Sequence, residues 1–175
     1  MTPAGPLAVA ARVSLLLVLA LLFQLSVAAR IEVFGVQGDV MLLVAVTAGL
    51  AAGPDRGAAV AFAAGITFDL LLQSPFGLSA LTYVIVAYVV GSMQDSFLRA
   101  AWWIPVATAV IGSVFGVILY GVFGTMVGED LLHPRLLGIA AVVALLNALA
   151  AQPMMRAMRW ATDTAGSVRS RAIMR

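Results

Sequence analysis

The 175-residue sequence contains no cysteine, no lysine and a single histidine. Without cysteine, the chain can form neither a disulfide framework nor a thiolate metal site. A zinc site usually needs three or four protein ligands, so His133 with Glu129 and Asp130 nearby is a poor candidate. The sequence also lacks GxSxG, HExxH and P-loop motifs, and no pair of carboxylates is placed for catalysis within an apolar stretch. We therefore expect no enzymatic activity, no bound metal and no cofactor.

Charged residues are also scarce, at 10% of the chain, whereas hydrophobic residues make up 63%. Ordinary soluble domains carry about 25% charged and about 45–50% apolar residues. A soluble fold could not bury so much apolar surface, and the mean hydropathy is +1.08. The composition therefore indicates an all-α integral membrane protein. The length leaves room for one domain and no separate catalytic module.

Six apolar stretches, separated by polar or Gly- and Pro-containing breaks, predict a six-helix transmembrane bundle. The predicted spans cover residues 7–29, 36–53, 57–72, 78–93, 102–127 and 136–155, and residues 156–175 form a basic tail. The first run could be a cleaved signal peptide, but a transmembrane helix is the better interpretation because a multi-span protein needs no cleaved signal. The second run is short for a hydrocarbon core of about 30 Å. Its helix either begins earlier, near Phe34, or ends inside the membrane.

The arginines predict how the spans are oriented, because cytoplasmic loops carry an excess of basic residues. With the N-terminus in the cytoplasm, only Arg30 and Arg135 fall on the outer side. The others fall on the cytoplasmic side: Arg12, Arg56, Arg99, Arg156, Arg159, Arg169, Arg171 and Arg175. Both termini are therefore predicted to be cytoplasmic. We expect the tail arginines to contact anionic lipid or a cytoplasmic protein.

Asp69 is a carboxylate inside an otherwise apolar run, just before the break at Gln73-Ser74-Pro75. An acid in a membrane span costs on the order of 2.5–3.5 kcal/mol on insertion scales, so something must satisfy it. Asp69 could cap the turn that follows or pack against another helix. It could also contact a partner, or carry a proton or an ion.

Small residues recur at a spacing of four, which places them on one face of a helix. The pairs are Gly49 with Gly53, Ala61 with Gly65, Gly112 with Gly116 and Gly124 with Gly128. In lipid, close backbone approach through small residues is a main source of packing energy. These faces are predicted to pack within the chain or, alternatively, against a partner.

The stretch from Gly57 to Gly91 resembles the rod-shape-determining protein MreD family. The resemblance rests on Gly57, Phe62, Gly65, Asp69-Leu70-Leu71, Phe76-Gly77, Leu81 and Tyr88, which follow the spacing of that family's pattern. Asp39 before an apolar run also resembles the family's Pro-Asp start to its second span, with Gly38 in place of the proline. The candidate structural or partner-contact residues are Asp69, Gly65, Gly57, Pro75, Gly77, Asp39, Gly112 and Gly116.

The resemblance implies a non-enzymatic scaffold of the bacterial elongation machinery in the plasma membrane. The implied partners are an MreC-type bitopic protein and a RodA-type peptidoglycan polymerase with its class B transpeptidase, and no nucleic acid is expected. The family also resembles, in fold, the substrate-binding S components of energy-coupling-factor vitamin transporters. That alternative function would need an outward pocket, for which Asp69, Gln73, Ser74, Glu129 and His133 are the candidate polar residues.

Overall fold

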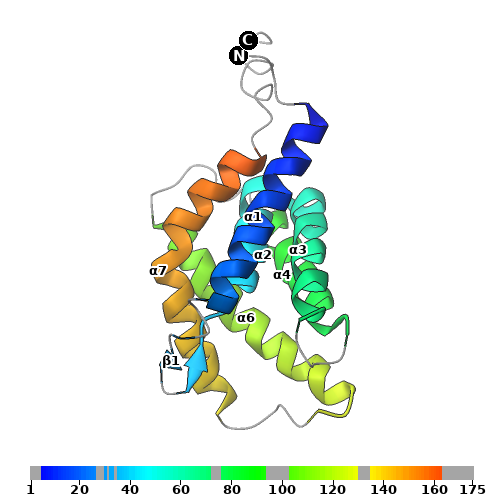
Figure 1. The fold of residues 1–175 in the computed structure, drawn as a ribbon. Helices are drawn as coiled ribbons and strands as arrows, with labels where there is room; N and C mark the ends of the chain where they lie inside the picture. The colour runs from blue at the N-terminus through cyan, green and yellow to red at the C-terminus, as the bar shows by residue number, and fades with distance from the viewer. Residues whose placement is uncertain are drawn as a thin grey trace.

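The computed structural model describes residues 5–26, 30, 32–33, 35–71, 76–93, 103–129 and 135–162. Within these ranges the chain is a bundle of six helices with one short β-ribbon (Figure 1). The helices are α1 (Pro6–Ser26), α2 (Val40–Ala52), α3 (Pro54–Asp69), α4 (Leu78–Ser92), α6 (Ile104–Met126) and α7 (Leu136–Thr162). Strands β1 (Glu32–Val33) and β2 (Val36–Gln37) pair antiparallel between α1 and α2. Several positions named above lie outside the described residues: Gln73, Ser74, Pro75, Asp130 and His133.

The six helices confirm the prediction of an all-helical bundle. Three of them, α1, α6 and α7, are long and apolar enough to cross a membrane. The apolar helices α2 and α4 are shorter, at 13 and 15 residues. At 1.5 Å per residue, α2 is only about 20 Å long.

The start of the second helix differs from the prediction. We expected a span from residue 36, but Val36–Gln37 pairs with Glu32–Val33 in the ribbon, and α2 begins only at Val40. The ribbon pairs backbone N–H and C=O groups that would form helical hydrogen bonds if α2 began earlier. An origin near Phe34 is therefore wrong, and α2 is a short helix.

The start of the third helix and the end of the last also differ from the prediction. The Gly53-Pro54-Asp55-Arg56 segment was expected to separate two helices, but Gly53 alone makes the turn, with φ of 84°, and Pro54 already belongs to α3. Proline fits the first helical turn because its missing N–H would have no partner there. At the other end of the chain, α7 continues past Met155 to Thr162 and contains Pro153.

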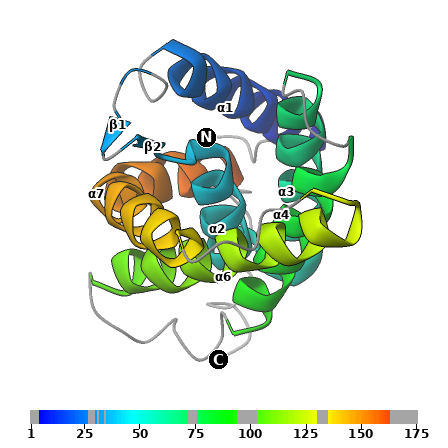
Figure 2. The same ribbon diagram turned by 90° about the horizontal axis from the view of Figure 1, so that it is seen from below.

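Helix α2 lies at the centre of the bundle. It contacts each of the other five described helices, which surround it when the bundle is viewed along its length (Figure 2). Every residue from Val40 to Leu50 is buried. A helix that is hydrophobic on all sides is suited to this position, because no face of it needs to meet a polar solvent.

Glycines set the distance between α2 and the helix that follows it. A Cβ atom built on Gly57 of α3 would lie 2.6 Å from the Cα of Gly49 in α2, so a side chain there would force the two backbones apart. Gly49 in turn faces the backbone of Ala87 in α4. The absence of side chains at these two positions therefore allows α3 and α4 to approach the central helix closely.

Two further glycines bring α6 against the same helix. A Cβ atom on Gly112 would lie 2.7 Å from Val46, and one on Gly116 would lie 2.6 Å from Leu42. Both neighbours are side chains of α2, so the Gly112–Gly116 face of α6 holds the bulky residues of the central helix. The faces that carry Gly49, Gly112 and Gly116 are thus used for packing within the chain, whereas Gly128 lies beyond the end of α6 with open space beside it.

Candidate functional site

Asp69 is the last residue of α3, and only 3% of its surface is exposed. Its carboxylate accepts hydrogen bonds from three backbone amides at the start of α4. Oδ2 accepts from Gly77 at 2.9 Å and from Ala80 at 3.2 Å, and Oδ1 accepts from Ser79 at 3.2 Å. The first amides of a helix have no partner within the helix, and the helix dipole favours an acid there. Asp69 thus caps α4 and connects it to α3.

Two glycines allow this capping geometry. Gly77 adopts a left-handed conformation, with φ of 95°, which turns the chain so that its N–H faces the carboxylate. Gly65 lies one turn before Asp69, and a Cβ atom there would lie 2.6 Å from the backbone nitrogen of Ala80. Close contact between α3 and α4 at Gly65 keeps the carboxylate within hydrogen-bonding distance of α4.

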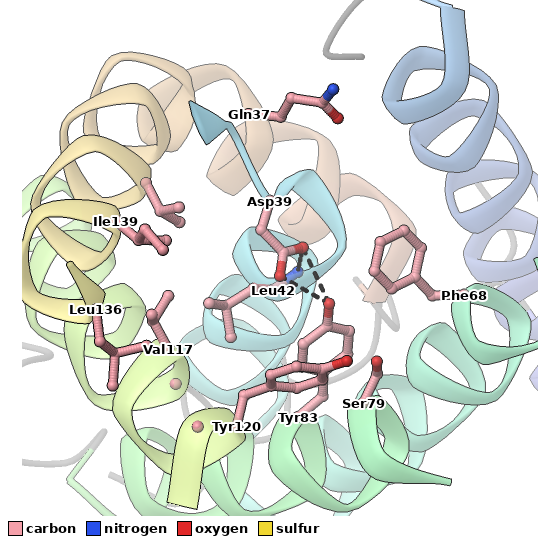
Figure 3. Close-up of a pocket in the computed structure, with 13 residues that line it drawn as sticks. Gln37, Asp39, Leu42, Phe68, Ser79, Tyr83, Val117, Tyr120, Leu136 and Ile139 are labelled. Atoms are coloured by element: carbon pink, nitrogen blue, oxygen red, sulfur yellow. Dashed lines mark hydrogen bonds between the residues drawn. The ribbon is translucent and has the colours of Figure 1, made fainter. Parts of the chain in front are cut away.

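Asp39 directly precedes α2 and caps it, as Asp69 caps α4. Its Oδ1 accepts a hydrogen bond from the backbone N–H of Leu42 at 2.8 Å, and the hydroxyl of Tyr83 donates to Oδ2 at 2.8 Å (Figure 3). Tyr83 belongs to α4 and is almost completely buried. The Asp39 carboxylate therefore caps the central helix and also links it to α4.

Two amide side chains complete the buried polar cluster around Asp39. Gln24 of α1 donates to the carbonyl of Gly38 at 2.9 Å and accepts from the N–H of Val40 at 2.8 Å. Asn147 of α7 donates to the backbone carbonyl of Asp39 at 3.0 Å and to Ser113 Oγ of α6 at 2.9 Å. Five helices thus contribute to one hydrogen-bonded cluster at the start of α2. Buried polar groups are costly unless paired, so this cluster favours a single arrangement of the helices.

A cavity of about 310 Å³ lies beside Asp39, between α2, α3, α4, α6 and α7 (Figure 3). Its polar wall carries Asp39, Tyr83, Ser79, Tyr120 and Gln37. The rest of its wall is apolar or glycine: Leu42, Phe68, Gly116, Val117, Gly121, Leu136, Ile139 and Val143. The rings of Phe68 and Tyr83 are stacked, with centroids 6.4 Å apart and planes inclined by 25°. The cavity therefore combines a large apolar surface with a few grouped polar atoms, which is the composition of small-molecule sites.

Ser79 contributes an unusual atom to this cavity wall. Its side chain is fully buried, and its Oγ has no hydrogen-bond partner among the described residues. Its backbone N–H is bonded to Asp69, so the residue is fixed in place at the start of α4. Leaving a buried hydroxyl unpaired costs about 1–3 kcal/mol. Of the fully buried side-chain polar atoms in the described residues, Ser79 Oγ is the one that lacks a hydrogen-bond partner.

A second hollow, the α1–α7 groove, lies between these two helices and reaches Val40 of α2. It has a volume of about 360 Å³, and its wall is apolar. The side chains that line it are Leu15, Leu16, Leu19, Ala20, Phe23, Val40, Ala150, Pro153, Met154, Ala157 and Trp160. At one end the guanidinium of Arg12 lies 5.3 Å from the ring centroid of Trp160. This groove is therefore suited to an apolar occupant.

The structure divides the residues singled out from the sequence between two places. At the junction of α3 and α4 lie Asp69, Gly65 and Gly77, and at the central helix lie Asp39, Gly57, Gly112 and Gly116. Pro75 lies outside the described residues. Asp69 and Glu129 were named as candidate pocket residues for the alternative transporter function. Neither lines the cavity, and Glu129 is exposed.

Sequence reasoning singled out Asp39 but missed other residues that form the polar wall and the cluster. Tyr83, Gln24 and Ser79 are polar groups within apolar runs, which is the signal that drew attention to Asp69. Being uncharged, they did not stand out. Among the described residues, no group of three or more His, Asp or Glu side chains could hold a metal ion.

Comparison with known families identifies the chain's relatives. The profile of the family described as rod shape-determining protein MreD matches residues 8–159, which include all of the buried cluster, the cavity and most of the groove. No curated protein and no solved structure gives a significant match. The family consists of membrane proteins, as the composition and the three long apolar helices indicate. The chain belongs to the rod shape-determining MreD family and has a role in rod-shape determination.

Proposed function

We propose that the chain is a non-enzymatic scaffold of the bacterial cell-elongation machinery, which supports lateral peptidoglycan synthesis. The observation that carries this proposal is the family match over residues 8–159. The internal geometry agrees with it, because Asp39, Asp69 and Asn147 are all bonded to the chain itself. Carboxylates and amides used in this way hold helices together. A bundle fixed by such bonds is suited to presenting a constant surface to partners.

The proposed location is the bacterial plasma membrane, crossed several times, with both termini in the cytoplasm. The start of α1 and the end of α7 lie at the same end of the bundle, as the contact between Arg12 and Trp160 indicates (Figure 1). Most arginines are predicted on that side, which agrees with the basic bias of cytoplasmic loops.

The proposed partner is an MreC-type bitopic protein, which would in turn connect the chain to a RodA-type polymerase and its class B transpeptidase. We assign its single transmembrane helix to the groove between α1 and α7. Both flanking helices are long enough to cross a membrane, and the groove is apolar along its wall. A helix seated there would gain packing contacts along two neighbours, which is the main source of helix association in lipid.

Cysteine cross-linking tests this assignment directly, because the natural chain has no cysteine. A single cysteine replaces Leu19 in the groove, and a matched control carries one at Ile111, an α6 residue that is 70% exposed on another face. Single cysteines are scanned along the partner's transmembrane helix in native membranes. We expect Leu19→Cys to cross-link with a helical periodicity and Ile111→Cys to give no product. Cross-linking from Ile111 alone would contradict the groove assignment.

A second candidate function is that of a vitamin-transporter S component, and the cavity beside Asp39 is the observation that favours it. The two functions predict different companions in mild detergent. A scaffold should co-purify with a bitopic protein and wall-synthesis enzymes. An S component should co-purify with a transmembrane coupling protein and paired ATPases, and recovery of these would overturn the scaffold proposal.

A further inference from the structure

The cavity beside Asp39 has properties that a role in holding helices together does not explain. It lies at the end of the bundle where α2 and α4 begin, and the side chains around it point inward from several helices (Figure 3). Its volume of about 310 Å³ is within the range of small-ligand pockets. A scaffold that only needed to be rigid would gain by filling this space with side chains.

Two polar groups on the wall have bonding capacity that the protein leaves unused. Ser79 Oγ has no partner among the described residues, although the hydroxyl can donate one hydrogen bond and accept two. The Asp39 carboxylate accepts from Leu42 and Tyr83, and a carboxylate offers about four acceptor sites. A bound molecule could therefore bond to both groups without breaking the helix caps.

The charge and aromatic character of the wall define the class of molecule. None of the described residues that line the cavity is basic, whereas Asp39 is acidic, so an anionic group would be repelled. Phe68, Tyr83 and Tyr120 contribute aromatic rings, which attract cations through their faces. The remaining apolar wall suits a hydrocarbon body. These features together select a cation with an apolar body.

We propose that this cavity binds a small organic amine, with its ammonium group at Asp39 and Ser79 and its apolar body against α6 and α7. A phospholipid with an amine headgroup shares the ammonium chemistry but also carries a phosphate. The described cavity wall offers no basic partner for that phosphate, so a soluble amine is the better fit. Binding of an amine is a property additional to the scaffold function and does not depend on it.

The test uses the full-length protein purified in detergent, with 2-phenylethylamine as the probe. Ligands that bind only the folded state raise its unfolding temperature in a saturable manner. We expect such a rise with 2-phenylethylamine and none with 3-phenylpropanoate, which has a similar body but carries a carboxylate. Equal effects of the two probes, or no saturable effect of the amine, would overturn the proposal.

Two variants locate the binding in this cavity. Ser79→Ala removes a hydroxyl that has no internal partner, so the protein should fold normally and bind the amine about three- to tenfold more weakly. Val117→Trp fills the cavity and should abolish binding, whereas Ile111→Trp on the exposed face of the same helix should leave it unchanged. Unchanged binding in Ser79→Ala would refute the assignment even if Val117→Trp did not fold.

A competition measurement separates the soluble amine from a lipid headgroup. Phosphatidylethanolamine in mixed micelles should not displace 2-phenylethylamine. Displacement by this lipid, but not by phosphatidylglycerol, would place a lipid headgroup in the cavity and overturn the assignment to a soluble molecule.

Discussion

Replacing Asp69 with alanine tests whether the α3–α4 junction stabilises the bundle. The Asp69 carboxylate satisfies the buried amides of Ser79 and Ala80 and the partly buried amide of Gly77. Each buried amide left unpaired costs about 1–3 kcal/mol, so the two fully buried ones alone give a loss of about 2–6 kcal/mol. The side-chain oxygen of asparagine can still accept from some of these amides. Asp69→Asn should therefore lower the free energy of unfolding less than Asp69→Ala does.

The measurement is the free energy of unfolding by SDS titration in mixed micelles. Asp55 provides the matched control, because it lies in the first turn of the same helix but is exposed. Asp55→Ala removes the same charge and should lose only about 0.3–1 kcal/mol through the helix dipole. If Asp69→Ala cost no more than Asp55→Ala, the capping bonds would not be a source of stability and our reasoning would be refuted.

Two further comparisons test other contacts by the same titration. Gly65→Ala should destabilise the protein by about 1–3 kcal/mol, because the added Cβ would collide with the backbone of α4. Gly138→Ala in α7 places its Cβ in open space and should be neutral or stabilising. Equal effects of the two variants would argue against close packing at Gly65. Tyr83→Phe removes the hydrogen bond to Asp39 and should lower the free energy of unfolding by about 1.5–3 kcal/mol. Tyr88→Phe on the exposed face of the same helix should have almost no effect. An unchanged stability of Tyr83→Phe would show that Asp39 does not need this donor.

The sequence predicted the features that depend on local composition. The apolar stretches predicted the helical class and the six helices found among the described residues. The isolated charge of Asp69 pointed to a buried group that needs hydrogen-bond partners. The ribbon was missed because each of its strands has only two residues, which is too short to show the alternation of apolar and polar residues typical of a strand. The pairing of Val36–Gln37 with Glu32–Val33 depends on a turn that composition alone does not specify.

The candidate site was harder to predict because its bonds join distant parts of the chain. Tyr83 and Asn147 meet Asp39 across 44 and 108 positions of sequence. Helical periodicity tells which residues share a face but not which other helix that face meets. The cavity was therefore not predicted. Its polar wall includes Asp39, Ser79 and Tyr83, of which the sequence singled out only Asp39.

The central place of α2 has a consequence for how the protein is made. Domains emerge from the ribosome N-terminus first, so α2 is synthesised before the helices that surround it on most sides. The Asp39 carbonyl accepts from the N–H of Leu43, and it receives its additional bond from Asn147 only when α7 has been translated. A nascent chain that stops before α7 would therefore expose an apolar flank of its innermost helix and lack one of the bonds at the start of that helix. Membrane proteases that survey unfinished products should degrade such fragments rapidly. The surroundings of α2 are therefore completed only after α7 has been made.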